Sequence, residues 1–170
     1  LLKILAAEAP LSIQAHPNPS QAIAGFEQEN LQGVDLSDPV RNYKDDKAKP
    51  EMIVALSPTF EALVGFSDVR IIQERLQELL ELSPSVALAE LLANWLKMLE
   101  SLDGIRKVFM DSLTNPSLND QVISDFVDCA EQSPALVELV SHLTTHHGLD
   151  RGVISATFLN QVTLTRGQAI

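Results

Sequence analysis

Cysteine, basic residues and long apolar runs are all scarce in this sequence of 170 residues. Cys129 is the only cysteine, so no internal disulfide can form, and we expect a reducing, cytoplasmic setting. Twelve basic side chains stand against 23 acidic ones, and the formal net charge is −11. The chain therefore lacks the clustered cations that nucleic acids and anionic membranes attract, and we expect neither as a partner. No apolar run reaches the length of a membrane-spanning helix.

Both ends of the sequence have unusual features. The chain begins without methionine inside an apolar run, and no basic stretch precedes that run, so we do not interpret it as a signal peptide. It stops at TLTRGQAI, the pattern of a strand, a turn and the start of another strand. We therefore expect a piece of a longer protein.

The first part of the chain, up to about residue 68, is rich in proline and short apolar runs. Residues 19–30 predict a short helix, and residues 37–50 predict an irregular loop. Four apolar runs have the length of strands: LKILAA, LSIQAH, MIVAL and FEALVGF.

From about Asp68 to His147 the apolar residues recur at helical spacing. Asp103-Gly104 separates two helices, and Gly148 ends the last one. Helix starts are predicted at four positions: Asp68, Ser85, Asn119 and Pro134.

After Gly152 the pattern returns to β, with ATFLNQVTLT followed by a turn at Arg166-Gly167. The order of strands, helices and strands predicts a helical domain inserted into a β-domain. Between residues 69 and 155 there are 13 acidic and 6 basic side chains, which we interpret as a solvated outer face.

The stretch LSIQAHPN places three polar side chains on one face of a predicted strand. Ser12, Gln14 and His16 alternate with apolar neighbours, so they point the same way. An imidazole nitrogen and an amide oxygen can both bind Zn²⁺. A metal site, an aqueous pocket and a merely exposed strand face all fit this pattern, and the exposed face is the commonest cause of it.

A second polar stretch surrounds Pro50. Lys49 and Glu51 are two residues apart and would share a face at the start of an apolar strand. Lys44, Lys47 and Lys49 form the densest cationic group, which can attract a small anion such as a phosphorylated sugar. A lysine-rich surface loop is the alternative, and spacing alone favours it.

Other candidate residues favour structural roles. His142 and His146 have metal-binding spacing, but without a third ligand nearby we interpret them, with His147, as ordinary histidines at a helix end. Three large side chains at helical spacing predict core positions: Trp95, Met98 and Phe109. Cys129 has no context that would activate a thiol.

Taken together, these segments resemble the type I mannose-6-phosphate isomerases (phosphomannose isomerases). The QxHP and KPE elements, with RNYKD just before the second, are specific to that family. Five segments carry the resemblance in order: PLSIQAHPN at 10–18, RNYKD at 41–45, KPEM at 49–52, FEALVGF at 60–66 and LNQVTLTRGQAI at 159–170.

The resemblance implies an α+β fold: a cupin-type β-barrel (jelly roll) with an inserted α-helical domain, incomplete at both ends. Residues 1–68 would carry the zinc and substrate motifs of the barrel, residues 69–152 would be the insertion, and residues 153–170 would return to the barrel.

The same resemblance implies a Zn²⁺ enzyme of carbohydrate metabolism, including GDP-mannose biosynthesis. The metal ligands at matching positions are Gln14, His16 and Glu51, and the candidate catalytic residues in the substrate pocket are Ser12 and Lys49. Mannose 6-phosphate and fructose 6-phosphate would interconvert by proton transfer between C1 and C2 through an enediol. Lys49 can serve as the base or only stabilise the anion.

Two departures from the family pattern stand out. Ala48 replaces the histidine that the family commonly has before KPE, and the family's fourth ligand, a histidine after a GEAI-like strand, has no counterpart before the chain ends at Ile170. We therefore expect the 170 residues alone to bind zinc weakly and to be inactive. The alternatives are a non-catalytic cupin-like protein that binds sugar phosphates, and a helical interaction module on a β scaffold.

Overall fold

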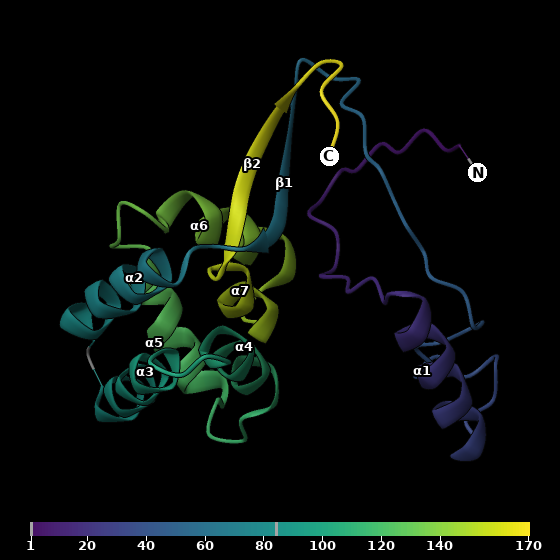
Figure 1. Cartoon of the computed structure of the whole chain (residues 1–170). Helices are drawn as coiled ribbons and strands as arrows, with labels where there is room; N and C mark the ends of the chain where they lie inside the picture. Colours follow the sequence, from purple (N-terminus) through teal and green to yellow (C-terminus); the bar gives the residue numbers. More distant parts are fainter. Residues whose placement is uncertain (1, 84) are drawn as a thin grey trace. The chain divides into compact units, whose positions relative to one another are not determined.

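A computed structural model describes residues 2–83 and 85–170, which combine helices with a small sheet (Figure 1). The chain divides into two compact units. The helical unit comprises Leu1–Ile13 and Glu61–Thr163, and the motif unit comprises Gln14–Phe60 and Leu164–Ile170. Within the described residues, no helix has the length and apolar character needed to cross a membrane.

The helical unit is built around one apolar core. Its helices are α2 (Val69–Leu82), α3 (Val86–Leu99), α4 (Gly104–Thr114), α5 (Asp120–Ala130), α6 (Val137–His147) and α7 (Arg151–Ala156). Helix α3 packs against α2, α4 and α5, while α7 packs against α4, α5 and α6. Trp95 is fully buried and meets Phe158 edge to face, with ring centroids 5.7 Å apart. Burying two aromatic side chains in this geometry is a large part of what stabilises such a core.

The predicted capping residues explain where three of these helices begin. The side chains of Asp68, Ser85 and Asn119 accept hydrogen bonds from backbone N–H groups in the first turns of α2, α3 and α5. Helix α6 ends at Gly148, which has a positive φ of 69°. These helix boundaries confirm the predictions from sequence.

Two helix predictions were wrong in detail. Helix α6 starts at Val137 rather than at Pro134, because a turn closed by the bond from Leu136 N–H to Ser133 C=O comes first. The return to β-structure was predicted from residue 153, which lies within helix α7. It forms because the Asp150 side chain caps it, accepting from Gly152 N–H at 2.6 Å.

The sheet has two strands, β1 (Thr59–Phe66) and β2 (Leu159–Thr165), which lie side by side in Figure 1. Bonds from Ser67 N–H to Phe158 C=O and from Arg166 N–H to Pro58 C=O show that they run antiparallel. Both strands were predicted, as FEALVGF and within ATFLNQVTLT. The mixture of helix and sheet is thus confirmed. Two strands among the described residues do not make a barrel, so the barrel stays a prediction.

Two other predicted strands, LKILAA and LSIQAH, were wrong, because both segments are irregular. MIVAL is confirmed only in part: Val54 and Ala169 form an isolated antiparallel bridge, and Ile53 and Ile170 exchange two backbone hydrogen bonds. A strand is defined by a partner with which it exchanges backbone hydrogen bonds. Among residues 2–83 and 85–170, the first two segments have no such partner.

Helix α1 (Pro19–Leu31) is the only helix of the motif unit among the described residues, and it was predicted at 19–30. A capping box starts it: Gln21 N–H donates to the Asn18 side chain at 2.9 Å, and Asn18 N–H donates to the Gln21 side chain at 3.0 Å. Pro19 occupies the first turn, where its missing N–H costs nothing. The segment from residue 34 to residue 58 has no helix or regular strand, as predicted for 37–50.

Candidate metal and sugar-phosphate site

Three of the five predicted site residues, His16, Lys49 and Glu51, meet in the motif unit. His16 lies two residues before the cap of α1, and the other two flank Pro50, more than thirty residues along the chain. His16 Nε2 lies 3.5 Å from Glu51 Oε2, and Lys49 Nζ lies 2.9 Å from Glu51 Oε1. The folding of the loop onto α1 therefore gathers an imidazole, a carboxylate and an ammonium group.

A backbone hydrogen bond fixes the orientation of the His16 ring. Its Nδ1 lies 2.7 Å from the carbonyl oxygen of Lys49. A carbonyl can only accept, so we assign the proton to Nδ1, which leaves the lone pair of Nε2 directed toward Glu51. Histidines that bind metals commonly hold the second ring nitrogen in this way, and the bond sets the tautomer and the ring plane.

The spacing of His16 and Glu51 fits a metal ion. With Nδ1 protonated, Nε2 and Oε2 both carry lone pairs, and a cation between them stabilises both. Two ligands of a tetrahedral zinc ion, each about 2.0–2.2 Å from the metal, are themselves about 3.4 Å apart. The observed 3.5 Å matches that separation.

The two oxygens of Glu51 have different neighbours. Oε2 faces His16, while Oε1 accepts from the Lys49 ammonium. The side chains of His16, Glu51 and Lys49 are 37%, 44% and 68% exposed, respectively, so this edge of the motif unit is open to a small polar ligand. A cation between His16 and Glu51 Oε2 would leave the pair of Lys49 with Oε1 in place, and the exposed Lys49 ammonium could contact an anion beside that cation.

The remaining two predicted residues are less constrained. Gln14 is exposed in the same unit, two residues before His16, in an irregular segment rather than on a strand. Ser12 is exposed and belongs to the helical unit. Within the described residues, no group of three or more His, Cys, Asp or Glu side chains surrounds a common point. A complete ligand set therefore needs Gln14 or further donors.

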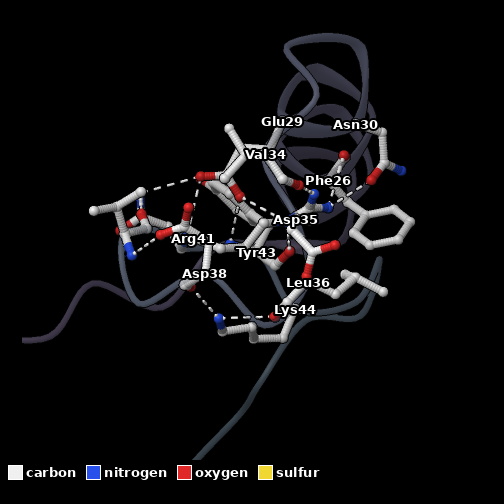
Figure 2. A network of polar contacts seen from close by, with 12 residues as sticks. Phe26, Glu29, Asn30, Val34, Asp35, Leu36, Asp38, Arg41, Tyr43 and Lys44 are labelled. Carbon is white, nitrogen blue, oxygen red and sulfur yellow. Dashed lines mark hydrogen bonds and ion pairs between the residues drawn. The ribbon is translucent and has the colours of Figure 1, made fainter.

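Arg41, in the RNYKD motif, holds the loop that leads to this site (Figure 2). Its guanidinium is buried, with 4% of the residue exposed. The group donates to the Tyr43 carbonyl at 2.7 Å and to the Asn30 side chain at 2.7 Å, and Nε lies 3.3 Å from Glu29 Oε2. It also donates to Val34 C=O and lies over the Phe26 ring, 5.0 Å from its centroid. The planar guanidinium group of arginine has five N–H donors, so it can bind this many acceptors at once.

Glu29 completes this network from α1. It accepts from Tyr43 N–H at 2.8 Å and from Asn42 N–H at 3.1 Å. The Tyr43 bond is the largest cause that holds the pKa of Glu29 below its ordinary value; the Asn42 bonds and the Arg41 charge also lower it, against a partial desolvation. Glu29 was not predicted as a site residue, because spacing alone does not reveal which carboxylate pairs with Arg41.

Residues beside the network give it close packing. The Tyr43 ring lies against α1 at Gly25, where an added Cβ would come within 2.4 Å of the ring. Lys44 Nζ donates to the carbonyls of Leu36 and Asp38, at 3.0 and 2.8 Å (Figure 2). The Lys44 ammonium therefore closes a turn and is less accessible to an anion than its sequence position suggests. Lys47 and Lys49, the other members of the predicted cationic group, are exposed, and the Lys49 ammonium pairs with Glu51.

Comparison with known proteins finds similarity to one family of enzymes. Residues 1–69 match the model of the phosphomannose isomerase type I catalytic domain. The chain is 33% identical over 181 residues to mannose-6-phosphate isomerase of Shigella flexneri, and 32% identical over 177 residues to that of Escherichia coli K12. Each match covers 100% of this chain and 42% of the relative, so the chain spans less than half the length of these proteins.

Solved structures agree with the sequence matches. The structure of mannose 6-phosphate isomerase from Salmonella typhimurium bound to fructose 6-phosphate and zinc has a TM-score of 0.77 and 26% identity, over 97% of this chain and 41% of that one. A second structure, bound with zinc and yttrium, has the same TM-score, identity and coverage. Over its whole length, the chain is therefore similar to part of the type I phosphomannose isomerases.

Proposed function

We propose that this chain supplies the zinc-binding and substrate-binding part of a mannose-6-phosphate isomerase. The reaction is the interconversion of mannose 6-phosphate and fructose 6-phosphate by proton transfer between C1 and C2 through an enediol. In this proposal, residues 1–68 and 153–170 belong to a cupin-type barrel and residues 69–152 are its helical insertion. The observation that carries the proposal is the meeting of His16, Lys49 and Glu51, with the spacing of two zinc ligands and a cation beside them.

The metal would be held by His16 Nε2, Glu51 Oε2 and the Gln14 amide oxygen. When bound, zinc supplies a Lewis acid that polarises the oxygens on C1 and C2. The Lys49 carbonyl keeps the His16 lone pair directed at the metal position. Without that bond the imidazole could flip or change tautomer, and the ligand set would lose its shape.

Lys49 has a second role through its side chain. Its ammonium lies beside the metal position and can hold the negative charge that develops on the sugar oxygen during proton transfer. Ser12 would contribute a hydroxyl to the substrate pocket. Glu51 is a poor candidate for the base, because a carboxylate that binds a metal and contacts Lys49 is less available to a substrate proton.

The test uses the protein in its full natural length, loaded with zinc. Mannose 6-phosphate should be converted to fructose 6-phosphate, and the reaction in D₂O should place deuterium at C1 or C2 of the sugar. Chelation should abolish turnover, and added zinc should restore it. His16→Ala should remove both zinc and activity, whereas His147→Ala, a change in the helical unit, should leave both intact.

Other results would overturn the proposal. A protein that holds zinc and binds fructose 6-phosphate but shows no turnover in either direction is a sugar-phosphate binding protein. A His16→Ala variant with normal zinc content would refute the ligand assignment, whatever its activity.

A further inference from the structure

We propose that His142 and His146 form a second metal site, an open one that binds Cu²⁺ and Zn²⁺ reversibly on the surface of α6. The inference concerns the helical unit only and does not depend on the isomerase proposal. It departs from the sequence-based interpretation of these residues as ordinary histidines of a helix end.

The two histidine rings lie next to each other on one face of α6. His142 and His146 are four residues apart on α6, so they lie one above the other on the same face of the helix. Their ring centroids are 4.9 Å apart, and the ring planes cross at 73°. Both residues are exposed, and within the described residues neither imidazole has a hydrogen bond or an ion pair. A pair of histidines at this spacing is the arrangement by which helices bind zinc in metalloproteases.

The neighbouring histidine is arranged differently. His147 Nε2 lies 3.0 Å from the carbonyl oxygen of Pro10, so the ring is held by the first segment of the helical unit. It lies about 100° around the helix from His146 and cannot share a face with the pair. His147 is thus already engaged, and it provides a matched control on the same turn.

The charges of the helical unit also favour a cation at this pair. His146 is in the last turn of α6, where the carbonyl ends of the helix carry partial negative charge. The helical segment around it is also acidic, with 13 acidic against 6 basic side chains between residues 69 and 155. The helix end and the acidic side chains both attract a dication. They therefore raise the metal affinity of the two imidazoles.

The donor set limits what the site can do. No third His, Cys, Asp or Glu side chain joins the pair in the part of the chain that the structure describes. Water must fill the other coordination positions, so the site is weaker than a four-ligand structural zinc site and exchanges its metal. Imidazole ligands bind Cu²⁺ more tightly than Zn²⁺ and hardly bind Mg²⁺ or Ca²⁺.

The test separates this site from the one at His16. The chain with His16→Ala is titrated with Cu²⁺ by calorimetry and by electron paramagnetic resonance. One ion should bind per chain, with coupling to two nitrogen nuclei. In the same background, His142→Gln and His146→Gln should each weaken binding by at least about tenfold, and His147→Gln should leave it unchanged. Because His142 and His146 are exposed, both variants should remain folded. Circular dichroism of each variant checks this.

Three results would overturn the inference. Cu²⁺ affinity that is the same in His142→Gln and His147→Gln would place the ion elsewhere. A spectrum with coupling to one nitrogen nucleus would exclude the chelate. Equal binding of Mg²⁺ would show nonspecific attraction to the acidic surface instead of an imidazole site.

Discussion

A single guanidinium connects helix α1 to the loop that carries Lys49 and Glu51. Arg41 donates hydrogen bonds to backbone carbonyls and to a side-chain amide, and it pairs with a carboxylate. No other side chain can make all these contacts. We expect Arg41→Lys to keep the charge but leave several buried acceptors unpaired, and to destabilise the motif unit by about 2–3 kcal/mol. Tyr43 is the only tyrosine, so urea unfolding followed by its ring NMR signals reports on this unit.

The matched control for that substitution is Arg166→Lys. Arg166 is exposed, and its side chain makes no hydrogen bond or ion pair within the described residues. The Arg166→Lys substitution should change the free energy of unfolding by less than about 0.5 kcal/mol. Equal effects of the two substitutions would show that the Arg41 network is not a source of stability.

The lowered pKa of Glu29 makes the same network sensitive to acid. A carboxyl group whose pKa is depressed on folding stabilises the native state above its unfolded pKa. That stabilisation is lost as the pH falls through the lower, folded pKa. The motif unit should therefore lose stability as the pH falls below about 4.5, which unfolding curves at several pH values would measure. Glu29→Gln should be less stable at neutral pH and should show a smaller loss on acidification. A wild-type-like acid response in that variant would contradict the role of Glu29.

In the helical unit, the indole N–H of the buried Trp95 has one hydrogen-bond acceptor, the carboxylate of Asp111. Trp95 Nε1–H donates to Asp111 Oδ2 at 2.7 Å, and Asn115 donates to the same oxygen at 2.9 Å. We expect Asp111→Ala to leave the indole N–H unpaired in the core and to destabilise the unit by about 1–3 kcal/mol. Fluorescence of Trp95, the only tryptophan, measures the unfolding directly. The control is Asp128→Ala, on the exposed side of α5. An equal loss of stability in this control would show that the bond between Asp111 and Trp95 does not stabilise the unit.

At the scale of elements, the capping box of α1 comes two residues after His16. The Asn18 side chain fixes the first turn of the helix, so its loss should let that turn fray. Asn18→Ala should lower the protection of amide hydrogens in the first turn by an amount equivalent to about 0.5–2 kcal/mol, measured by hydrogen exchange. Asn18→Asp keeps an acceptor at the same place and should retain protection. Similar exchange in both variants would show that the cap does not hold the helix.

The helices and the paired strands were the elements most easily predicted from sequence. Capping residues such as Asp68 and Asn119 act within one turn, so a local pattern is enough to place them. Residues 2–16 show the limit of that reasoning. Their apolar runs have the composition of strands, but strand formation depends on a partner far away in sequence. Helix α7 was missed because its six residues are too few to show a period.

At the scale of the whole molecule, the candidate site was predicted from motifs, and its geometry was not. Spacing put Lys49 and Glu51 near each other, and the family resemblance added His16 to them. The bond from the His16 ring to the Lys49 carbonyl depends on how the loop folds over α1, and nothing in a linear pattern encodes it. The same is true of Glu29, whose partner Arg41 lies in a different segment.

Zinc binding to His16 is the central claim, and NMR of ¹⁵N-labelled histidine rings tests it most directly. Saturating zinc should shift the Nε2 resonance of His16, while Nδ1 stays protonated because it donates to the Lys49 carbonyl. Glu51→Gln should raise the zinc concentration needed for that shift by at least about tenfold. An unchanged His16 Nε2 resonance at saturating zinc, or coordination through Nδ1, would contradict the account.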